Sequence, residues 1–465
     1  MATKYDALII GTGQAGPTLA SRLAADGLKT AIIERNRFGG TCVNVGCTPT
    51  KTMVASARAA YVARRAAEFG VVIDGPVHMD MKRVKLRTDA VVRRSNEGVE
   101  KWLKNTKNLT VFEGHARFEG PHVVRVGDDL LTADRIFVNV GTRPAVPDIP
   151  GIGDVDILTN SDIVEIDFLP EHLVVIGGSY VGLEFGQMFR RFGSKVTIVE
   201  MKPRLIARED EDVSLAVHGI LENEGVDLRL NATCIALAPN GDGVKVTVDC
   251  EGGEPEVLGS HVLLAVGRQP NTDDLGLDKA GIDVNERGYI QVNDQLMTNV
   301  PNIWALGDVN GEGAFTHTSY NDHEIVADNL LNNDTRRLSD RIQTYGLFID
   351  PPLGRVGMTE AQARESGREV LVGKRLMTRV SRAVEKGETQ GFIKVMVDAN
   401  TQEILGAAIL GVGGDEAIHS IVDVMYAKAP YTVITRAVHI HPTVSELIPT
   451  TLGDLKPLET KADPQ

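Results

Sequence analysis

The segment YDALIIGTGQAGPTLASRLAADGLKTAIIE, residues 5–34, determines how the first part of this chain folds. Its first apolar run ends in Gly11, Gly13 and Gly16, a helical pattern follows, and a second apolar run ends at Glu34. Glycines at this spacing permit a tight turn and the close approach of a pyrophosphate to a helix N-terminus, while the acid accepts a hydrogen bond from a ribose hydroxyl. The segment therefore predicts a β-turn-α-β unit that binds a dinucleotide.

A second segment repeats this pattern. An apolar run over residues 172–176 leads into Gly177 and Gly182, and the next apolar run ends at Glu200. Ser179 stands where the middle glycine is expected, which predicts that the backbone approaches the phosphates less closely here. Two such units in one chain predict that it binds two nucleotides.

Glu200 bears on the choice of the second nucleotide. A carboxylate at this position hydrogen-bonds the 2′-hydroxyl of NAD and repels the 2′-phosphate of NADP, so we expect NADH. Lys202 and Arg204 lie just beyond it and can hold a phosphate, which keeps NADPH as the alternative.

Composition limits the class of protein. A chain of 465 residues with 42% hydrophobic and 24% charged residues is typical of a globular protein of about three domains. A net charge of −14 and a pI near 5.3 argue against nucleic acid and against an anionic membrane as partners, because both would repel it. The sequence shows no long apolar segment and no leader pattern, so a cytoplasmic location is expected.

Later segments indicate the domain order. Residues 138–150 and 262–272 contain glycine and proline in a pattern that predicts two crossings between domains. Residues 302–308 predict a strand that returns the chain to the first nucleotide unit. From about residue 343 onward strands alternate with helices, with one strand expected at 404–410, which predicts a separate α+β domain.

The segment GGTCVNVGCTPTK, residues 39–51, carries Cys42 and Cys47, two of only four cysteines in the chain. In a regular α-helix this five-residue step separates the Cα atoms by about 8–9 Å, which exceeds disulfide reach. Gly46 and Pro49 can supply the distortion that closes this gap, so we expect a bent helix entry. The leading interpretation is a redox dithiol. Two buried structural thiols are the alternative, and a zinc site is disfavoured because no second Cys or His pair lies nearby.

Together with HIHPTVSELIP, residues 439–449, these motifs resemble the flavin-dependent pyridine nucleotide-disulfide oxidoreductases, the family of glutathione reductase, lipoamide dehydrogenase and mercuric reductase. The resemblance spans essentially the whole chain, with the motifs in the same order. The cysteine segment is most similar to that of mercuric reductase, whereas HIHPTVSE is similar to that of lipoamide dehydrogenase and glutathione reductase. The two motifs thus indicate different substrates but the same chemistry.

The resemblance implies an α/β fold with two Rossmann-like nucleotide-binding domains, one for FAD and one for NAD(P), and a C-terminal α+β dimerisation domain. The implied domains are residues 1–150 for the first part of the FAD-binding domain, 151–270 for the NAD(P)-binding domain, 271–340 for the second, central part of the FAD-binding domain, and 341–465 for the dimerisation domain. We therefore expect FAD and NADH as cofactors, and a homodimer.

The resemblance also implies roles for individual residues. Cys47 is the implied thiolate stacked on the flavin and Cys42 the outer sulfur that exchanges with substrate, while Lys51 pairs with Glu184 beside flavin N5. Tyr180 matches the tyrosine that covers the nicotinamide pocket until the cofactor enters. The other implied cofactor-binding positions are Gly11, Gly13, Gly16, Glu34, Gly40, Thr41, Ala116, Gly141, Gly177, Gly182, Glu200, Gly267, Gly307, Asp308 on the ribityl chain, Thr316 at the flavin ring, and His317.

The chemistry that the resemblance implies needs an acid and base near Cys42. Electrons pass from NADH through the flavin to the cysteine pair, and the released Cys42 thiolate attacks an external disulfide. His441, oriented by Glu446, is the implied acid and base, and it comes from the partner subunit, so an obligate homodimer is expected. His439 has no such role and is expected to be structural.

Three functions remain open at this point. The leading hypothesis is an NADH-dependent reductase of a small or lipoyl disulfide, or a dihydrolipoamide-type dehydrogenase that runs in the reverse direction. The runner-up is an NAD(P)H-dependent reductase of Cu(II) or Hg(II), although no cysteine follows Cys250, whereas mercuric reductases use an additional carboxyl-terminal pair. The third is a redox-sensing flavoprotein without turnover. No resident metal ion is expected, and Cys234 and Cys250 are expected to be buried and inert.

Overall fold

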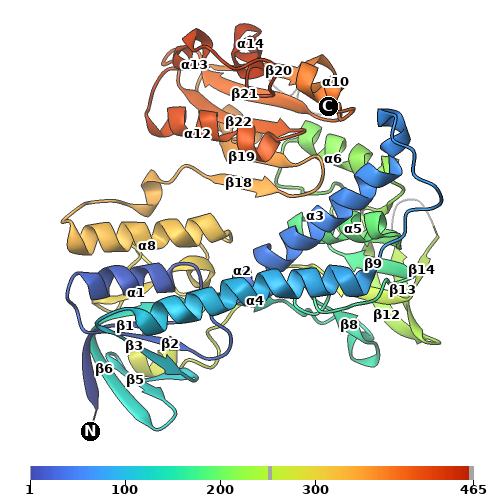
Figure 1. Cartoon of the computed structure of the whole chain (residues 1–465). Coiled ribbons are helices and arrows are strands. Elements are labelled where there is room, and N and C mark those ends of the chain that lie inside the picture. Colours follow the sequence, from blue (N-terminus) through green and yellow to red (C-terminus); the bar gives the residue numbers. More distant parts are fainter. Residues whose placement is uncertain (1, 250–253, 460–465) are drawn as a thin grey trace.

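The computed structural model of the protein describes residues 2–249 and 254–459, and Figure 1 shows three units built around separate sheets. The expectation for Cys250 falls outside the described residues, as does that for the side chain of Cys234. No helix within the described ranges combines the length and the apolar character that a membrane span requires.

The first unit contains a seven-stranded sheet with the order β3-β2-β1-β6-β5-β4, in which β17 pairs with β6. Its strands are β1 (Thr3–Ile10), β2 (Thr30–Glu34), β3 (Leu109–Glu113), β4 (Ala116–Gly120), β5 (Val123–Val126), β6 (Asp129–Val138) and β17 (Ile303–Ala305). Every residue of β2 is buried, as expected for a parallel strand with both faces covered. Because β17 joins β6, the chain returns to the first sheet as the sequence predicts.

Helices complete the first unit. The helices α1 (Gly16–Ala25) and α8 (Thr316–Leu331) lie side by side over the sheet, and the long helix α4 (Met81–Asn105) runs from this unit toward the second (Figure 1). A short helix, α7 (Leu277–Ala280), packs against β4. The first strand, its turn and α1 therefore form the β-turn-α-β unit that the glycine spacing predicts.

The second unit contains a five-stranded parallel sheet with the order β11-β10-β9-β15-β8. Its strands are β8 (Ile157–Leu158), β9 (His172–Ile176), β10 (Lys195–Val199), β11 (Asp227–Arg229) and β15 (His261–Leu264). The unit also contains the helices α5 (Tyr180–Phe192) and α6 (Glu211–Asn223). A second, antiparallel sheet consists of β12 (Thr233–Asn240), β13 (Gly243–Asp249) and β14 (Glu256–Gly259). The two predicted crossings pair with each other as a ribbon of β7 (Thr142–Pro144) and β16 (Arg268–Pro270). The chain thus enters and leaves this unit at one place.

The third unit is a six-stranded antiparallel sheet with the order β18-β19-β22-β21-β20-β23, and it lies at the top of Figure 1. Its strands are β18 (Thr344–Leu347), β19 (Leu353–Gly357), β20 (Val370–Leu376), β21 (Phe392–Asp398), β22 (Ile404–Leu410) and β23 (Lys456–Pro457). Its helices are α9 (Glu360–Glu365), α10 (Ser381–Glu385), α11 (Gly414–Ala417), α12 (His419–Tyr426), α13 (Thr432–Arg436) and α14 (Leu447–Gly453). The strand β22 has the predicted bounds.

The cysteine segment forms two helices with a break between them. The helix α2 (Gly40–Asn44) ends before Gly46, and α3 (Cys47–Arg64) begins after it. Gly46 has φ −123° and ψ −120°, and a Cβ on it would lie 2.8 Å from the carbonyl oxygen of Thr41. Pro49 lies in the first turn of α3, where its missing N–H has no helical partner to lose. The predicted bent helix entry is confirmed.

One apolar cluster connects the three units and fixes α3. Met53 of α3, Phe185 of α5 and Leu353 of β19 are all buried and belong to this cluster. Because the cluster holds α3 against α5, Lys51 and Glu184 on these two helices are placed face to face.

Candidate functional site

The glycine turn after β1 brings bare backbone close to a ligand position. Gly11 has φ +102°, and a Cβ on it would clash with the carbonyl oxygen of Asn139. The side chain of Asn139 accepts a hydrogen bond from the Gly16 N–H at 3.1 Å, which holds the start of α1. Glu34, at the end of β2, accepts from the Thr12 N–H at 3.1 Å. A backbone cradle with a carboxylate beside it fits the ADP half of FAD.

Of the other residues implied for FAD, Gly40 lies directly against this turn. A Cβ on Gly40 would lie 2.9 Å from the Cα of Gly13, so only glycine allows α2 to start this close to the turn. Thr142 Oγ1 donates to Asp308 Oδ2 at 3.0 Å, and Arg268 Nε lies 3.9 Å from the same oxygen. Burial raises the pKa of Asp308, against the opposing effect of Arg268. The remaining implied positions are Thr41 in α2, Ala116 at the start of β4, Gly141 before β7, Gly267 before β16, Gly307 after β17, and Thr316 and His317 at the start of α8.

The glycine turn after β9 repeats the geometry of the first. Gly177 has φ +118°, and a Cβ on it would clash with the backbone that follows β15, while a Cβ on Gly182 would clash with the carbonyl oxygen of Gly177. Glu200, directly after β10, accepts from the Gly178 N–H at 2.6 Å. Ser179 precedes α5, and its side chain makes no capping hydrogen bond. The turn fits a second nucleotide, with a carboxylate where a ribose is held.

Cys42 lies in α2 and Cys47 is the first residue of α3, and both sulfurs lie next to the start of α8. Cys42 and Cys47 are free thiols, and Oγ1 of Thr316 lies 3.2 Å from each sulfur. The hydrogen bond with Cys42 lowers the pKa of Cys47 to about 6, and Thr316 and the charge of Lys51 act in the same direction. The same hydrogen bond, with burial and the charge of Cys47, raises the pKa of Cys42. One sulfur therefore ionises readily while the other keeps its proton.

This difference between the two sulfurs predicts a pH dependence. Because the pKa of Cys47 is lowered from 9.0 to about 6, its thiolate dominates above pH 6 and is protonated below it, whereas Cys42 stays a thiol. In the reduced protein, the ultraviolet absorbance of a single thiolate should appear with a midpoint near pH 6. Subtracting the same titration of a Cys47→Ser variant isolates this signal. A midpoint near that of an ordinary thiol would contradict the assignment.

Lys51 carries a fixed positive charge close to the cysteines. Its ammonium forms an ion pair with Glu184 of α5, which is 7% exposed. The second carboxylate oxygen of Glu184 accepts from the Phe348 N–H at 2.9 Å, and the ammonium lies 4.5 Å from the centroid of the Phe348 ring. The contact that the resemblance implies between Lys51 and Glu184 is present, and its role beside the flavin stays a prediction.

Tyr180, the first residue of α5, lies in an aromatic group. Its ring meets the rings of Phe315 and Tyr345 edge to face, at centroid distances of 5.9 Å and 5.7 Å. Its hydroxyl donates to Glu209 at 3.1 Å. Phe315 in turn stacks on His317. The His317 ring nitrogen Nε2 contacts the carbonyl oxygen of Thr344, the first residue of β18. The implied nicotinamide cover is therefore packed between the second and third units.

The predicted pair of His441 and Glu446 forms, and its histidine is exposed. His441 Nδ1 lies 3.0 Å from both carboxylate oxygens of Glu446, which leaves Nε2 as the ring atom available for proton transfer. The His441 side chain is 73% exposed. Within residues 2–249 and 254–459, no hydrogen bond or ion pair joins His441 to Cys42 or Cys47. Within the described residues, the only contact of the His439 side chain is with the carbonyl oxygen of nearby Ala437.

Sequence reasoning missed three residues that shape the site. Asn139 fixes the first glycine turn, and its position directly after the apolar strand β6 was the available signal. Glu209 and Tyr345 contact Tyr180, and neither carries a motif that would have pointed to this contact.

Comparisons with known proteins agree with this arrangement. The family model described as pyridine nucleotide-disulphide oxidoreductase matches residues 5–322, and the model of the dimerisation domain of that family matches residues 344–452. The probable pyridine nucleotide-disulfide oxidoreductase RclA of Escherichia coli strain K12 is 39% identical over 451 residues, which cover 95% of this chain and 97% of that protein.

Other relatives differ in activity. A dihydrolipoyl dehydrogenase of Thermus scotoductus is 34% identical over 95% of this chain and 95% of its own length. A mercuric reductase of Streptomyces lividans is 31% identical over 96% of this chain and 95% of its own length. Among solved structures, the Cu(II) complex of the HOCl-induced flavoprotein disulfide reductase RclA from Escherichia coli has a TM-score of 0.88 at 37% identity, covering 97% of this chain and 99% of that chain.

Proposed function

Because the chain belongs to the pyridine nucleotide-disulphide oxidoreductases, we propose that it uses NADH to reduce a small or lipoyl disulfide through Cys42 and Cys47. Membership of this family makes it a flavin-dependent oxidoreductase that works with a pyridine nucleotide. The observation that supports the disulfide substrate most directly is the cysteine pair with unequal pKa values beside a paired lysine.

The two glycine turns are the proposed cofactor sites. The turn at Gly11 with Glu34 would hold the ADP half of FAD, and the turn at Gly177 with Glu200 would hold the second nucleotide. Bound FAD would accept a hydride from the nicotinamide and deliver the electron pair to the cysteine pair. The fixed charge of Lys51 would favour negative charge at that place.

The protein's own residues account for the disulfide half of the reaction. Cys42, deprotonated, attacks one sulfur of the substrate and expels the other as a thiolate, which takes up a proton. The Cys47 thiolate then attacks the Cys42 sulfur, which releases the second thiol and restores the cysteine disulfide. Because the pKa of Cys42 is raised, its proton must be removed by a base, and we assign this task to His441.

A homodimer follows from this assignment. His441 is exposed and makes no contact with the cysteines of its own chain among the described residues, and the chain carries the dimerisation domain of the family. We infer that His441 of each chain serves the cysteine pair of the other chain. We propose a cytoplasmic location, because a dithiol that must be reduced repeatedly suits a reducing compartment.

The choice of NADH rests on Glu200. A Glu200→Ala variant should lose the carboxylate that favours a free 2′-hydroxyl, so the ratio of kcat/KM for NADH to that for NADPH should fall by roughly tenfold. Steady-state rates with both nucleotides and one disulfide measure this ratio. Lys202→Ala is the matched control, because it removes a neighbouring charge of opposite sign and should raise the ratio. A wild-type enzyme that prefers NADPH would overturn the assignment.

The proposed activity is tested by NADH oxidation with a panel of acceptors. Lipoamide, oxidised low-molecular-weight thiols, Cu(II) and Hg(II) should each be offered to the purified holoenzyme. Turnover with a disulfide supports the proposal, and turnover with metal ions alone overturns it.

Metal-ion reduction is the second candidate function. It is favoured by the Cu(II) complex of the RclA structure and by the mercuric reductase relatives. Two neighbouring sulfurs are suitable soft ligands for such ions as substrates. The redox-sensing alternative without turnover is less well supported, because a sensor does not need the His441–Glu446 pair.

A further inference from the structure

A buried carboxylate connects Tyr180 to the third unit. Glu209 lies in the loop before α6, and its side chain has no exposed surface. Its Oε1 accepts from the Tyr180 hydroxyl at 3.1 Å and from the Tyr345 hydroxyl at 2.6 Å. Tyr180 belongs to α5 of the second unit, whereas Tyr345 belongs to β18 of the third. One oxygen therefore receives two tyrosine hydroxyls from different units.

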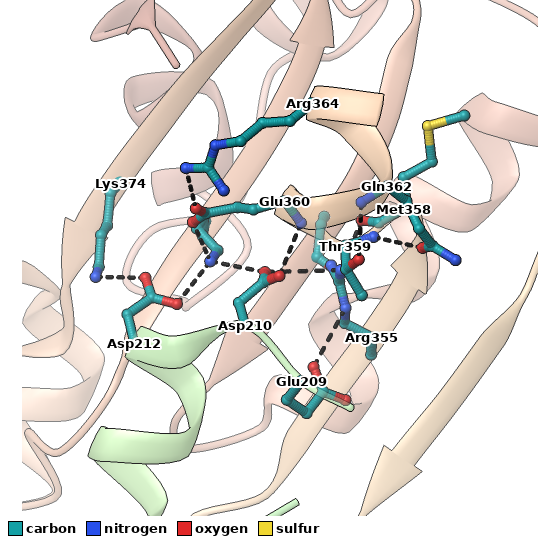
Figure 2. A network of polar contacts seen from close by, with 12 residues as sticks. Glu209, Asp210, Asp212, Arg355, Met358, Thr359, Glu360, Gln362, Arg364 and Lys374 are labelled. Atoms are coloured by element: carbon teal, nitrogen blue, oxygen red, sulfur yellow. Dashed lines mark hydrogen bonds and ion pairs between the residues drawn. The ribbon is translucent and has the colours of Figure 1, made fainter. Parts of the chain in front are cut away.

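The nearest cation to this carboxylate, Arg355, forms an ion pair with it but no hydrogen bond. Arg355 Nε lies 3.5 Å from Glu209 Oε2, longer than the usual hydrogen bond, and both atoms lack a hydrogen-bond partner. The Arg355 guanidinium instead donates to the carbonyl oxygens of Ala407 at 2.9 Å and Met358 at 2.6 Å. Figure 2 shows Arg355 between Glu209 and Asp210 in this network. Among the described residues, the two tyrosine hydroxyls supply the only side-chain hydrogen bonds to Glu209.

The buried cation Lys394 is paired without Glu209. Lys394, 1% exposed, lies 2.8 Å from Asp210 and 2.7 Å from both Asp212 and Glu360. Its charge is thus compensated by three carboxylates at hydrogen-bond distance. A buried carboxylate that depends on tyrosine hydroxyls holds them firmly, because an unmade hydrogen bond to a buried charge is costly.

We propose that Glu209 and Tyr345 are positioning residues that keep Tyr180 in its closed conformation, so that the nicotinamide must break the Tyr180–Glu209 hydrogen bond in order to enter. The inference rests on the proposed function, in which Tyr180 covers the nicotinamide site at the start of α5. Tyr345 has two tasks in the closed state: its ring packs against Tyr180, and its hydroxyl holds the carboxylate in place. When Tyr180 leaves, Tyr345 continues to donate to Glu209 Oε1.

This arrangement has a measurable consequence for nucleotide affinity. The apparent Kd of a ligand that needs the open conformation equals its intrinsic Kd divided by the open fraction. Removing the hydroxyl of Tyr180 raises the open fraction while the ring remains. The affinity of Tyr180→Phe for the nucleotide should therefore increase by roughly tenfold.

The test measures binding separately from turnover. NAD⁺ is titrated into the oxidised holoenzyme by isothermal titration calorimetry for the wild type, Tyr180→Phe, Glu209→Gln and the double variant. Both single variants should bind more tightly, Glu209→Gln by the smaller factor, because its amide oxygen still accepts from Tyr180 but without the charge. The double variant should bind no more tightly than Tyr180→Phe, because both changes act on the same bond. In steady-state assays of Tyr180→Phe, the KM for NADH should fall by a larger factor than that by which kcat changes.

A control variant separates loss of the Tyr180–Glu209 hydrogen bond from general damage to the network. Asp212→Asn removes a carboxylate that contacts Lys394 and Lys374 but neither tyrosine, so NAD⁺ affinity should stay at the wild-type value. Unchanged affinity in Tyr180→Phe, additive gains in the double variant, or an equal gain in Asp212→Asn would each overturn the proposal. If Glu209→Gln does not fold, Tyr180→Phe and its control still decide, because they leave Glu209 in place. Failure of the proposed function would show differently, as a wild-type holoenzyme that does not bind NAD⁺ at all.

Discussion

Replacing Cys47 by serine is expected to abolish disulfide reduction, with kcat falling by roughly 10⁴-fold or more, the scale seen when a nucleophile is removed. The reason is that Cys47 carries the low pKa of the pair, and its thiolate is required to attack Cys42 and release the second product thiol. A serine hydroxyl does not ionise at neutral pH and cannot form the disulfide. The measurement is steady-state NADH oxidation with the best disulfide of the acceptor panel.

The Cys47→Ser variant needs two controls. Its flavin content and its reduction by NADH in the absence of a disulfide should stay close to the wild-type values, because neither glycine turn is touched. Cys234→Ser removes a cysteine far from the pair in sequence and should keep full turnover. Disulfide turnover that survives in Cys47→Ser would show that the electrons reach the substrate by another route.

The second large effect is expected from His441→Ala, which should lower disulfide turnover by about 10²- to 10⁴-fold. The proton of Cys42 is held by a raised pKa, and the expelled thiolate needs a proton, so loss of the imidazole affects both events. Reduction of the flavin by NADH should be unaffected. Reduction of Cu(II) should also be indifferent to this change, so the variant separates the two candidate functions.

Hybrid dimers test where His441 acts. Coexpression of His441→Ala and Cys42→Ser chains with two different tags yields a dimer in which only one site combines an intact cysteine pair with an intact histidine from the other chain. Such hybrids should recover up to half of the wild-type activity, although each parent dimer is inactive. Inactive hybrids would place the histidine in the same chain as its cysteines. His439→Ala is the matched control. It should retain turnover, because within the described residues the His439 side chain contacts only nearby backbone.

Local spacing predicted the parts of the site that lie within one short segment. The two glycine turns, the break between α2 and α3 at Gly46, and the strand β22 all depend on residues close together in sequence. The family resemblance added the Lys51–Glu184 pair, which spans 133 residues and which no local pattern indicates. The parallel pairing of β1 with β2 follows from the same β-turn-α-β unit.

The rest required three-dimensional packing. Asn139 lies 123 residues from Gly16, and Tyr345 lies 136 residues from Glu209, so no local pattern pairs either residue with its partner. The low pKa of Cys47 depends first on its hydrogen bond with Cys42 and then on Thr316, which reaches the pair from α8, 269 residues beyond Cys47. Burial and long-range hydrogen bonds determine these contacts and pKa values, and the hydrophobic periodicity of the sequence does not predict them.

The central claim is that electrons from NADH reach a disulfide through Cys42 and Cys47, and thiol labelling tests it most directly. The oxidised holoenzyme is mixed with one equivalent of NADH without oxygen, quenched with N-ethylmaleimide, and mapped by mass spectrometry before and after addition of the disulfide substrate. We predict that both cysteines become labelled after NADH and lose this labelling after the substrate is added. Consumption of NADH and substrate while the labelling of the pair stays constant would contradict the account.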